Sequence, residues 1–307
     1  MMDVGSTLNL KDERQRCLDH WLTEAVSIGS LEFVKLFLEK GADINVREHG
    51  ETLLMIAAGG KYQDSCRIAE LLVAKVADVN ARDAEEKTAF MYAVLADNIK
   101  VMHTLWTSKA DINAVDYDGS SALLLAFHQK KETIELLVSQ EADVSVKDKH
   151  GQNILMLSAA LGSPEICEFF LSKGCNPYDK DNEGQNALMI AVKSKNIKAV
   201  EFFISIKMDV DTVNNKGETP LMVAAEMGDL ELCTLLVDHG ANVNAKDNCG
   251  KTALIAAASK GRTQVVLFLL RKKAFSHVKH DDGYTALAIA KCGGHKETVK
   301  ALKKNSA

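Results

Sequence analysis

One segment of the sequence resembles a phosphate-binding loop in residue types and spacing. Residues 245–252 read Ala-Lys-Asp-Asn-Cys-Gly-Lys-Thr and end in the Gly-Lys-Thr triplet of a P-loop. The segment is one residue short, however, and has Ala245 where the first glycine of the motif belongs. A P-loop also needs glycines that let backbone amides reach phosphate, with a strand before it and a helix after it. The sequence therefore predicts a turn that enters a short helix, and no nucleotide site.

The histidines and cysteines form no recognisable catalytic or metal-binding set. The chain has nine histidines and seven cysteines, with neither an HExxH nor a CxxC motif. His277 and His280 lack a cysteine or carboxylate at metal-ligand spacing, because Asp281 and Asp282 belong to a predicted hairpin tip. An odd number of unpaired cysteines indicates free thiols in a reducing compartment, the cytoplasm or the nucleus. We expect no metal, no cofactor and no catalytic residue.

An internal repeat predicts the secondary-structure elements on which any functional site would lie. Two markers recur in register at a spacing of about 33 residues. No linker divides the 307 residues, which favours a fold that grows in one dimension. The first marker is Thr52, Thr88, Ser121, Asn153, Asn186, Thr219, Thr252 and Thr285, and the second is Ala42, Ala77, Ala110, Ala142, Cys175, Met208, Ala241 and Ala274.

The motifs around these markers resemble those of the ankyrin family. Residues 217–225 read GETPLMVAA, similar to the family's G-x-T-P-L-H-x-A-A, and residues 235–245 read LLVDHGANVNA, similar to its L-L-L-x-x-G-A-D-V-N-A. The resemblance covers roughly residues 15–304 and implies an all-α ankyrin-repeat solenoid of helix-turn-helix units with β-hairpin tips. We expect one domain over residues 1–307, its first and last repeats serving as caps, with repeats at roughly 15–47, 48–82, 83–115, 116–147, 148–180, 181–213, 214–246, 247–279 and 280–304.

The local structure of a repeat follows from its residue types. Leu221, Ala224 and Ala225 have the i, i+3, i+4 spacing of a helix with one apolar face. The hydroxyl of Thr219 can cap that helix, and Gly240 can take the positive φ that ends the second helix. Asp-x-x-Gly sequences at 116–119, 148–151, 181–184 and 247–250 are typical of turns.

Two departures from the family pattern put local geometry in question. Apolar residues stand where the family has histidine, so the hydrogen bond of that histidine is expected to be lost: Met55, Met91, Leu124, Met156, Met189, Met222 and Ile255. Other residues replace glycine, at the end of the second helix or at the hairpin tip: Val76, Lys109, Glu141, Lys207 and, at the tip, Glu86.

Charge is distributed unevenly along the chain. Residues 259–307 hold 11 Lys or Arg against 3 Asp or Glu, whereas the whole chain has a net charge of −5. One interpretation is the polar terminal cap that a solenoid needs for solubility. The other is a basic end for an acidic partner segment, nucleic acid or a membrane surface. The overall negative balance argues against nucleic-acid binding, and no apolar run is long enough for membrane insertion.

By the resemblance, the chain is expected to be a protein-interaction scaffold or adaptor and not an enzyme. Ankyrin proteins bind partners through a concave face lined by the hairpins and first helices. Two alternatives remain open. The chain could be a recruiting or regulatory subunit whose enzyme lies on another chain, or it could bind a small anionic ligand in the groove.

Register places candidate partner-binding residues at the hairpin tips and at the ends of the first helices. The main strip, centred on the repeats at 83–115, 116–147 and 148–180, consists of Leu95, Tyr117, Asp118, His128, Gln129, His150 and Leu161. A secondary strip consists of Lys193, Asn215, Glu226 and Met227. In the alternative interpretation, Leu95 and Leu161 pack against neighbouring helices and only Tyr117 is exposed.

Three asparagines are candidates for hydroxylation. Asn80, Asn113 and Asn244 each follow a leucine by eight residues and lie in a Val/Ile-Asn-Ala turn. This resembles what oxygen-sensing asparaginyl hydroxylases accept in ankyrin repeats. The alternative is a turn asparagine whose side chain hydrogen-bonds the backbone.

Overall fold

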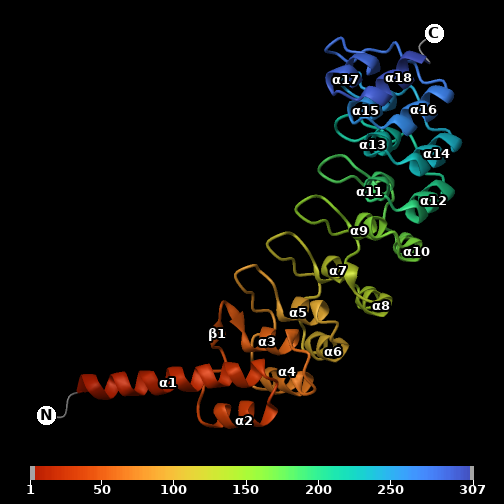
Figure 1. Ribbon diagram of the computed structural model, residues 1–307. Coiled ribbons are helices and arrows are strands. Elements are labelled where there is room, and N and C mark those ends of the chain that lie inside the picture. The colour runs from red at the N-terminus through yellow and green to blue at the C-terminus, as the bar shows by residue number, and fades with distance from the viewer. Residues whose placement is uncertain (1–3, 305–307) are drawn as a thin grey trace. The chain divides into compact units, whose positions relative to one another are not determined.

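The fold is all-α, as predicted. The computed structural model describes residues 4–304, without the side chains of residues 4–11 and of His128. Over this range, eighteen α-helices alternate with short connections (Figure 1). A small antiparallel hairpin of β1 (Arg47–Glu48) and β2 (Glu51–Thr52) pairs Arg47 with Thr52. Isolated β-bridges close three further hairpins, Arg82 to Thr88, Val115 to Ser121 and Lys279 to Thr285.

The chain divides into two compact units, residues 1–149 and 150–307, each built from pairs of helices. The pairs of the first unit are α1 (Val4–Ser27) with α2 (Leu31–Glu39), α3 (Leu53–Gly59) with α4 (Ser65–Ala74), α5 (Ala89–Leu95) with α6 (Ile99–Thr107), and α7 (Ala122–Leu125), continued by the 3-10 helix η1 (Ala126–His128), with α8 (Lys131–Ser139). Those of the second unit are α9 (Ile154–Leu161) with α10 (Pro164–Ser172), α11 (Ala187–Lys193) with α12 (Ile197–Ser205), α13 (Pro220–Met227) with α14 (Leu230–Asp238), α15 (Ala253–Ser259) with α16 (Thr263–Arg271), and α17 (Ala286–Cys292) with α18 (Lys296–Lys304).

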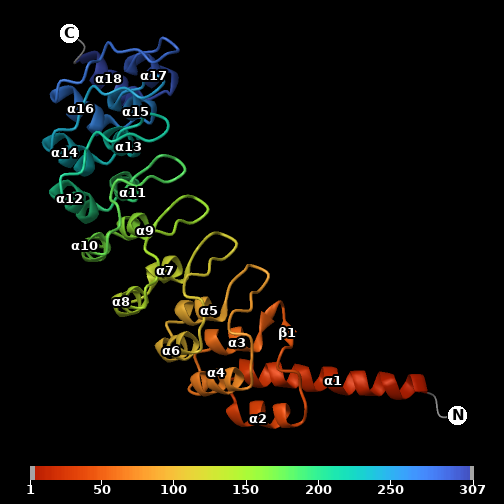
Figure 2. The same cartoon turned by 180° about the vertical axis from the view of Figure 1, so that it is seen from behind.

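Within each unit, the hairpins project from the side of the first helices, and the second helices lie behind them (Figures 1 and 2). We call the surface formed by the hairpin tips and the first helices of a unit its hairpin face. The first helix of the chain, α1, begins at Val4, before the predicted start of the first repeat near residue 15.

The first marker caps the first helix of each pair, as predicted. All eight residues of the marker, from Thr52 to Thr285, accept a hydrogen bond from the backbone N–H three residues further on. Such a cap contributes about 1 kcal/mol to helix stability. The expected loss of hydrogen bonding at the histidine position is wrong in two repeats. The sulfurs of Met55 and Met222 accept the N–H groups of Thr52 and Thr219 at 3.3 and 3.5 Å.

Apolar side chains from both helices of each pair fill the core. Leu54, Leu221 and Leu254 of the first helices are at most 1% exposed. Cys167 and Cys233 of the second helices are fully buried, and burial raises the pKa of each thiol to about 12. These two thiols therefore serve as packing groups of the core. They are unreactive, because thiols with so high a pKa carry almost no thiolate at neutral pH.

The residues that replace glycine keep the glycine conformation. Val76, Lys109, Glu141, Lys207 and the tip residue Glu86 all have a positive φ, between 62° and 67°. Lys273, which was not among the predicted replacements, is a further case, with a φ of 66°. The geometry of the repeat is therefore retained at these positions, at the cost of a left-handed backbone that side chains disfavour.

Val76 is the most strained of these positions, and Val76→Gly is expected to stabilise the protein. A β-branched side chain suits the left-handed region poorly, and the side chain of Val76 is 87% exposed, so it contributes little packing. Relief of the strain exceeds the added entropy of glycine in the unfolded chain, for a net gain of about 1 kcal/mol. Urea unfolding measures the gain. Val213→Gly, at an exposed valine without a positive φ, is the control and should destabilise. Equal losses at both positions would contradict the strain argument.

Candidate functional site

A groove of about 690 Å³ opens on the hairpin face of the second unit. Its walls come from the hairpins that precede α11 and α13, from the ends of these two helices, and from the segment that follows α15. All four residues of the predicted secondary strip line it: Lys193, Asn215, Glu226 and Met227. The structure thus brings these residues together, and their role in binding stays a prediction.

Hydrogen bonds between successive hairpins hold the tips beside this groove in place. The backbone N–H of Asn215 donates to the carbonyl of Glu183 at 2.9 Å, and its side-chain amide donates to the carbonyl of Asn182 at 2.9 Å. Asn248 makes the same two bonds one repeat later, to the carbonyls of Lys216 and Asn215 at 3.0 Å each. The tips therefore form a continuous ladder and present a preorganised surface.

Within each tip, the first residue of the Asp-x-x-Gly pattern secures the turn, as predicted. The carboxylate of Asp181 accepts the N–H groups of Glu183 and Gln185 at 2.9 and 2.8 Å. Asn214, which replaces the aspartate in the next hairpin, accepts two N–H groups through its side-chain oxygen in the same way. The turn therefore needs a side-chain acceptor at this position and not a charge.

A cluster of ion pairs joins the groove to the next hairpin. The Lys251 ammonium lies 2.7 Å from a carboxylate oxygen of Glu226 and 3.7 Å from one of Glu218, and Lys260 lies 3.4 Å from Glu226. Burial would raise the pKa of Glu226, but the hydrogen bonds and positive charges of Lys251 and Lys260 hold it below its ordinary value. Lys251, the lysine of the P-loop-like segment, is therefore engaged by carboxylates, and Thr252 caps α15. This agrees with the predicted hairpin tip.

The remaining lining gives the groove a mixed, slightly basic character. Val223 and Met227 supply its apolar side chains. Three glutamates lie against four cationic residues, and no serine, cysteine or histidine is among the described residues that line it: Glu183, Glu218 and Glu226, with Lys193, Lys216, Lys260 and Arg262. Such a surface can hold an extended, polar protein segment through hydrogen bonds and charge, as the rims of protein interfaces do.

The main predicted strip is divided between the two units. In the first unit, Leu95 and Tyr117 are 42% and 79% exposed, and Leu161 of the second unit is 41% exposed. The alternative in which only Tyr117 is exposed is therefore wrong. Gln129 lies against Leu95 and donates its side-chain amide to the Leu95 carbonyl at 3.0 Å. A carboxylate oxygen of Asp118 lies 2.7 Å from the Lys149 ammonium.

The other two residues of the main strip are histidines. The side chain of His128, at the end of η1, lies outside the described residues. His150, in the second unit, is exposed, and its backbone carbonyl accepts the N–H of Asn182 at 2.9 Å.

A half-buried tyrosine joins two hairpins of the first unit through its hydroxyl. The Tyr92 hydroxyl lies 2.8 Å from a carboxylate oxygen of Glu51 and 2.7 Å from one of Asp83. Burial, followed by the hydrogen bonds and charges of the two carboxylates, raises the pKa of Tyr92 well above its ordinary value. No sequence pattern indicates this contact, because Glu51 and Tyr92 are 41 residues apart.

An apolar hollow between α1 and α2 was also missed. Its volume is about 340 Å³, and three of its aromatic or aliphatic residues are more than half exposed. The signal that could have revealed it is the pair Phe33 and Phe37, four residues apart on α2 and therefore on one face of that helix. The hollow is lined by Trp21, Glu24, Ala25, Ile28, Phe33 and Phe37.

The three candidate hydroxylation residues bridge successive repeats. The side-chain oxygens of Asn80, Asn113 and Asn244 each accept a backbone N–H of the following repeat at 2.8 Å. Their side-chain nitrogens face the carbonyls of that repeat at 3.4 to 3.5 Å. Both polar atoms are thus used structurally, which favours the turn interpretation. Hydroxylation of these residues stays a prediction.

Comparison with known proteins places the chain in a family. The family model for ankyrin repeats matches residues 22–116, 101–181, 155–247 and 244–307. The chain therefore belongs to the ankyrin-repeat family. Ankyrin repeats are in general protein–protein interaction modules, and their fold is typically a non-catalytic scaffold. No helix in the part of the chain that the structure describes, residues 4–304, has the length and apolar character needed to cross a membrane.

Individual relatives share the repeats over limited stretches. The chain is 30% identical over 146 residues to the neurogenic locus notch homolog protein 1 of Xenopus laevis, covering 46% of this chain and 6% of that protein. It is 31% identical over 150 residues to the human transient receptor potential cation channel subfamily A member 1, covering 44% of this chain and 12% of the channel. The crystal structure of the Bcl-3 ankyrin repeat domain matches with a TM-score of 0.60 and 26% identity, over 71% of this chain and 99% of that domain. The chain thus spans only a small part of the length of the notch homolog and of the channel.

Proposed function

We propose that the chain is a protein-interaction scaffold or adaptor that binds a partner protein through its hairpin face. The observation that carries the proposal is the groove of about 690 Å³ on the second unit. It has the size and polarity of a site for a protein segment, and its walls are fixed by the ladder of hairpin bonds. Preorganised surfaces of this kind lower the entropic cost of binding.

The partner segment that suits the groove is polar and carries acidic residues. Lys193 and Lys216 face the groove, and Lys260 and Arg262 bring the basic region 259–307 into its lining. All three lining glutamates are already paired, Glu218 and Glu226 with Lys251, Glu226 also with Lys260, and Glu183 with Lys193. Lys216 and Arg262 then supply the remaining charge, which is cationic. Complementary charge on a partner would speed association and select the partner.

Two other functions would use the same surface. In one, the chain recruits a substrate to an enzyme whose catalytic residues lie on another chain, and a catalytic protein would be captured with it. In the other, the groove binds a small anionic ligand. An added nucleotide would then raise the melting temperature of the isolated chain, because binding to the folded state stabilises it. A scaffold for protein segments should show no such rise.

The groove is tested with the double variant Lys193→Glu, Met227→Ala. We expect the partner captured by the native chain to bind this variant about 30-fold more weakly, because the change reverses a charge and removes an apolar contact. The measurement is affinity capture with mass spectrometry, followed by titration of the purified partner. Lys198→Glu, the same charge change at an exposed lysine of α12, is the control and should leave the affinity unchanged. If the double variant binds normally and folds normally, the groove is not the partner site.

A further inference from the structure

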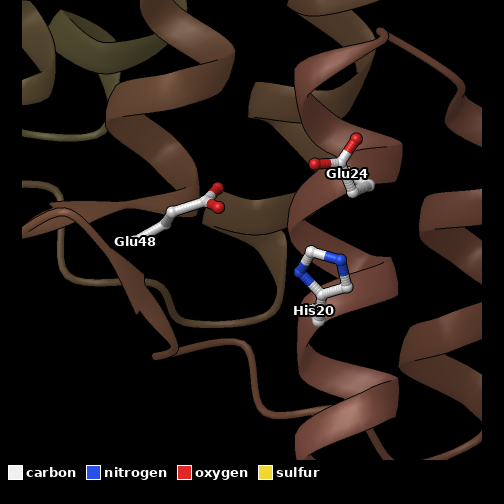
Figure 3. A group of neighbouring side chains, drawn as sticks. All are labelled: His20, Glu24 and Glu48. Atoms are coloured by element: carbon white, nitrogen blue, oxygen red, sulfur yellow. The ribbon is translucent and has the colours of Figure 1, made fainter.

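Three side chains that can bind metal converge near the N-terminal end of the first unit. His20 and Glu24 lie one turn apart on α1, and Glu48 lies in β1 of the first hairpin. One ligand atom from each residue lies within 4.8 Å of the others. The three side chains point toward one another (Figure 3). No metal site was expected from the sequence, since these residues come together only when the hairpin folds back beside α1.

The arrangement has two features of a metal site. Residues four apart on a helix share a face, so His20 and Glu24 can act on one ion. Over the described part of the chain, none of the three side chains has a hydrogen bond or ion pair to another residue. Within the described residues, neither carboxylate has a cationic side chain at ion-pair distance, so both are available to share one bound cation.

We propose that His20, Glu24 and Glu48 bind one divalent transition-metal ion of the zinc type. Imidazole nitrogen and carboxylate oxygen are zinc ligands, whereas calcium and magnesium take oxygen ligands alone. A tetrahedral zinc ion holds its ligand atoms about 3.4 Å apart, so rotation of the three side chains must bring them closer by about 1 Å. Water completes the coordination, since the protein supplies three ligands.

The ion would add a link between α1 and the first hairpin, whose preceding segment already bonds α1 through the Asp43 N–H to Asp19 at 2.7 Å. Its ligands join α1 to the hairpin between α2 and α3, so binding favours the folded N-terminal end of the unit. His277 and His280, which lie three residues apart in the sequence, make other contacts. His277 stacks on Phe275 with 5.6 Å between ring centroids, and the ring of His280 accepts the N–H of Asp282 within the last hairpin tip.

The test is calorimetric titration of the full chain with Zn²⁺ after its exposed thiols have been alkylated, since thiols also bind zinc. We expect one ion per chain, a rise in melting temperature of about 3–5 °C at saturation, and no binding of Mg²⁺ or Ca²⁺ at the same concentrations. His20→Ala and Glu48→Gln should each weaken Zn²⁺ binding at least tenfold. Circular dichroism checks that both variants fold.

The matched control is His103→Ala. His103 is an exposed helical histidine whose ring contacts Trp106 at 5.5 Å, much as that of His20 contacts Trp21 at 5.8 Å. This variant should bind Zn²⁺ like the native chain. The proposal is overturned if the alkylated native chain binds no zinc, or if His20→Ala and Glu48→Gln bind it as tightly as His103→Ala does.

Discussion

Gly184→Ala is expected to lower the free energy of unfolding by about 3 kcal/mol. Gly184 has a φ of +78°, a conformation that costs alanine about 1 kcal/mol. A Cβ atom there would also lie 2.7 Å from the backbone nitrogen of Asn215 and closer still to its side-chain oxygen. The hairpin ladder would have to shift, which adds about 2 kcal/mol. Urea unfolding, followed by circular dichroism, measures the loss.

Gly240→Ala is the control for this prediction. Gly240 has a similar φ of +93°, but nothing lies within 4 Å of a Cβ atom built there. Only the backbone term applies, so this variant should lose about 1 kcal/mol. Equal losses for the two variants would show that contact between successive tips adds nothing to stability.

Tyr117→Ala is expected to weaken partner binding by about 2 kcal/mol, a factor of about 30, while leaving stability unchanged. The side chain is 79% exposed and its backbone is held independently, since its N–H donates to the carbonyl of Glu85 at 2.9 Å. The carboxylate of Asp116 secures the same tip by accepting the N–H groups of Asp118 and Ser120 at 2.9 and 2.8 Å. Removing the ring therefore removes contact area without disturbing the turn.

The measurement pairs titration of the captured partner with thermal unfolding of each variant. Tyr178→Ala, at a 62% exposed tyrosine outside the predicted strip, is the control and should leave affinity and stability unchanged. If Tyr117→Ala binds normally while the groove variant loses affinity, the partner contacts the second unit alone. A fall in stability would instead make Tyr117 a structural residue.

Local sequence patterns were enough to predict the repeat and the hydrogen bonds inside each repeat. Thr219 caps α13 and Asp247 holds its hairpin tip because each side chain bonds backbone groups two to four residues away. Such contacts depend on local spacing, which a sequence displays directly. The same period also predicted that Lys193 and Met227 share a surface, because stacking repeats place equivalent positions side by side.

The tertiary structure alone decided the contacts that break the period. Glu51 and Asp83 meet at the hydroxyl of Tyr92, and Glu48 reaches His20 across the first hairpin. It also decided that Val76 takes a left-handed backbone like glycine, since the turn between stacked elements imposes that φ on whichever residue occupies it. The contacts at Tyr92 and at His20 join segments that only the stacking of helices brings together. Residue types along the chain do not encode the distances between such segments.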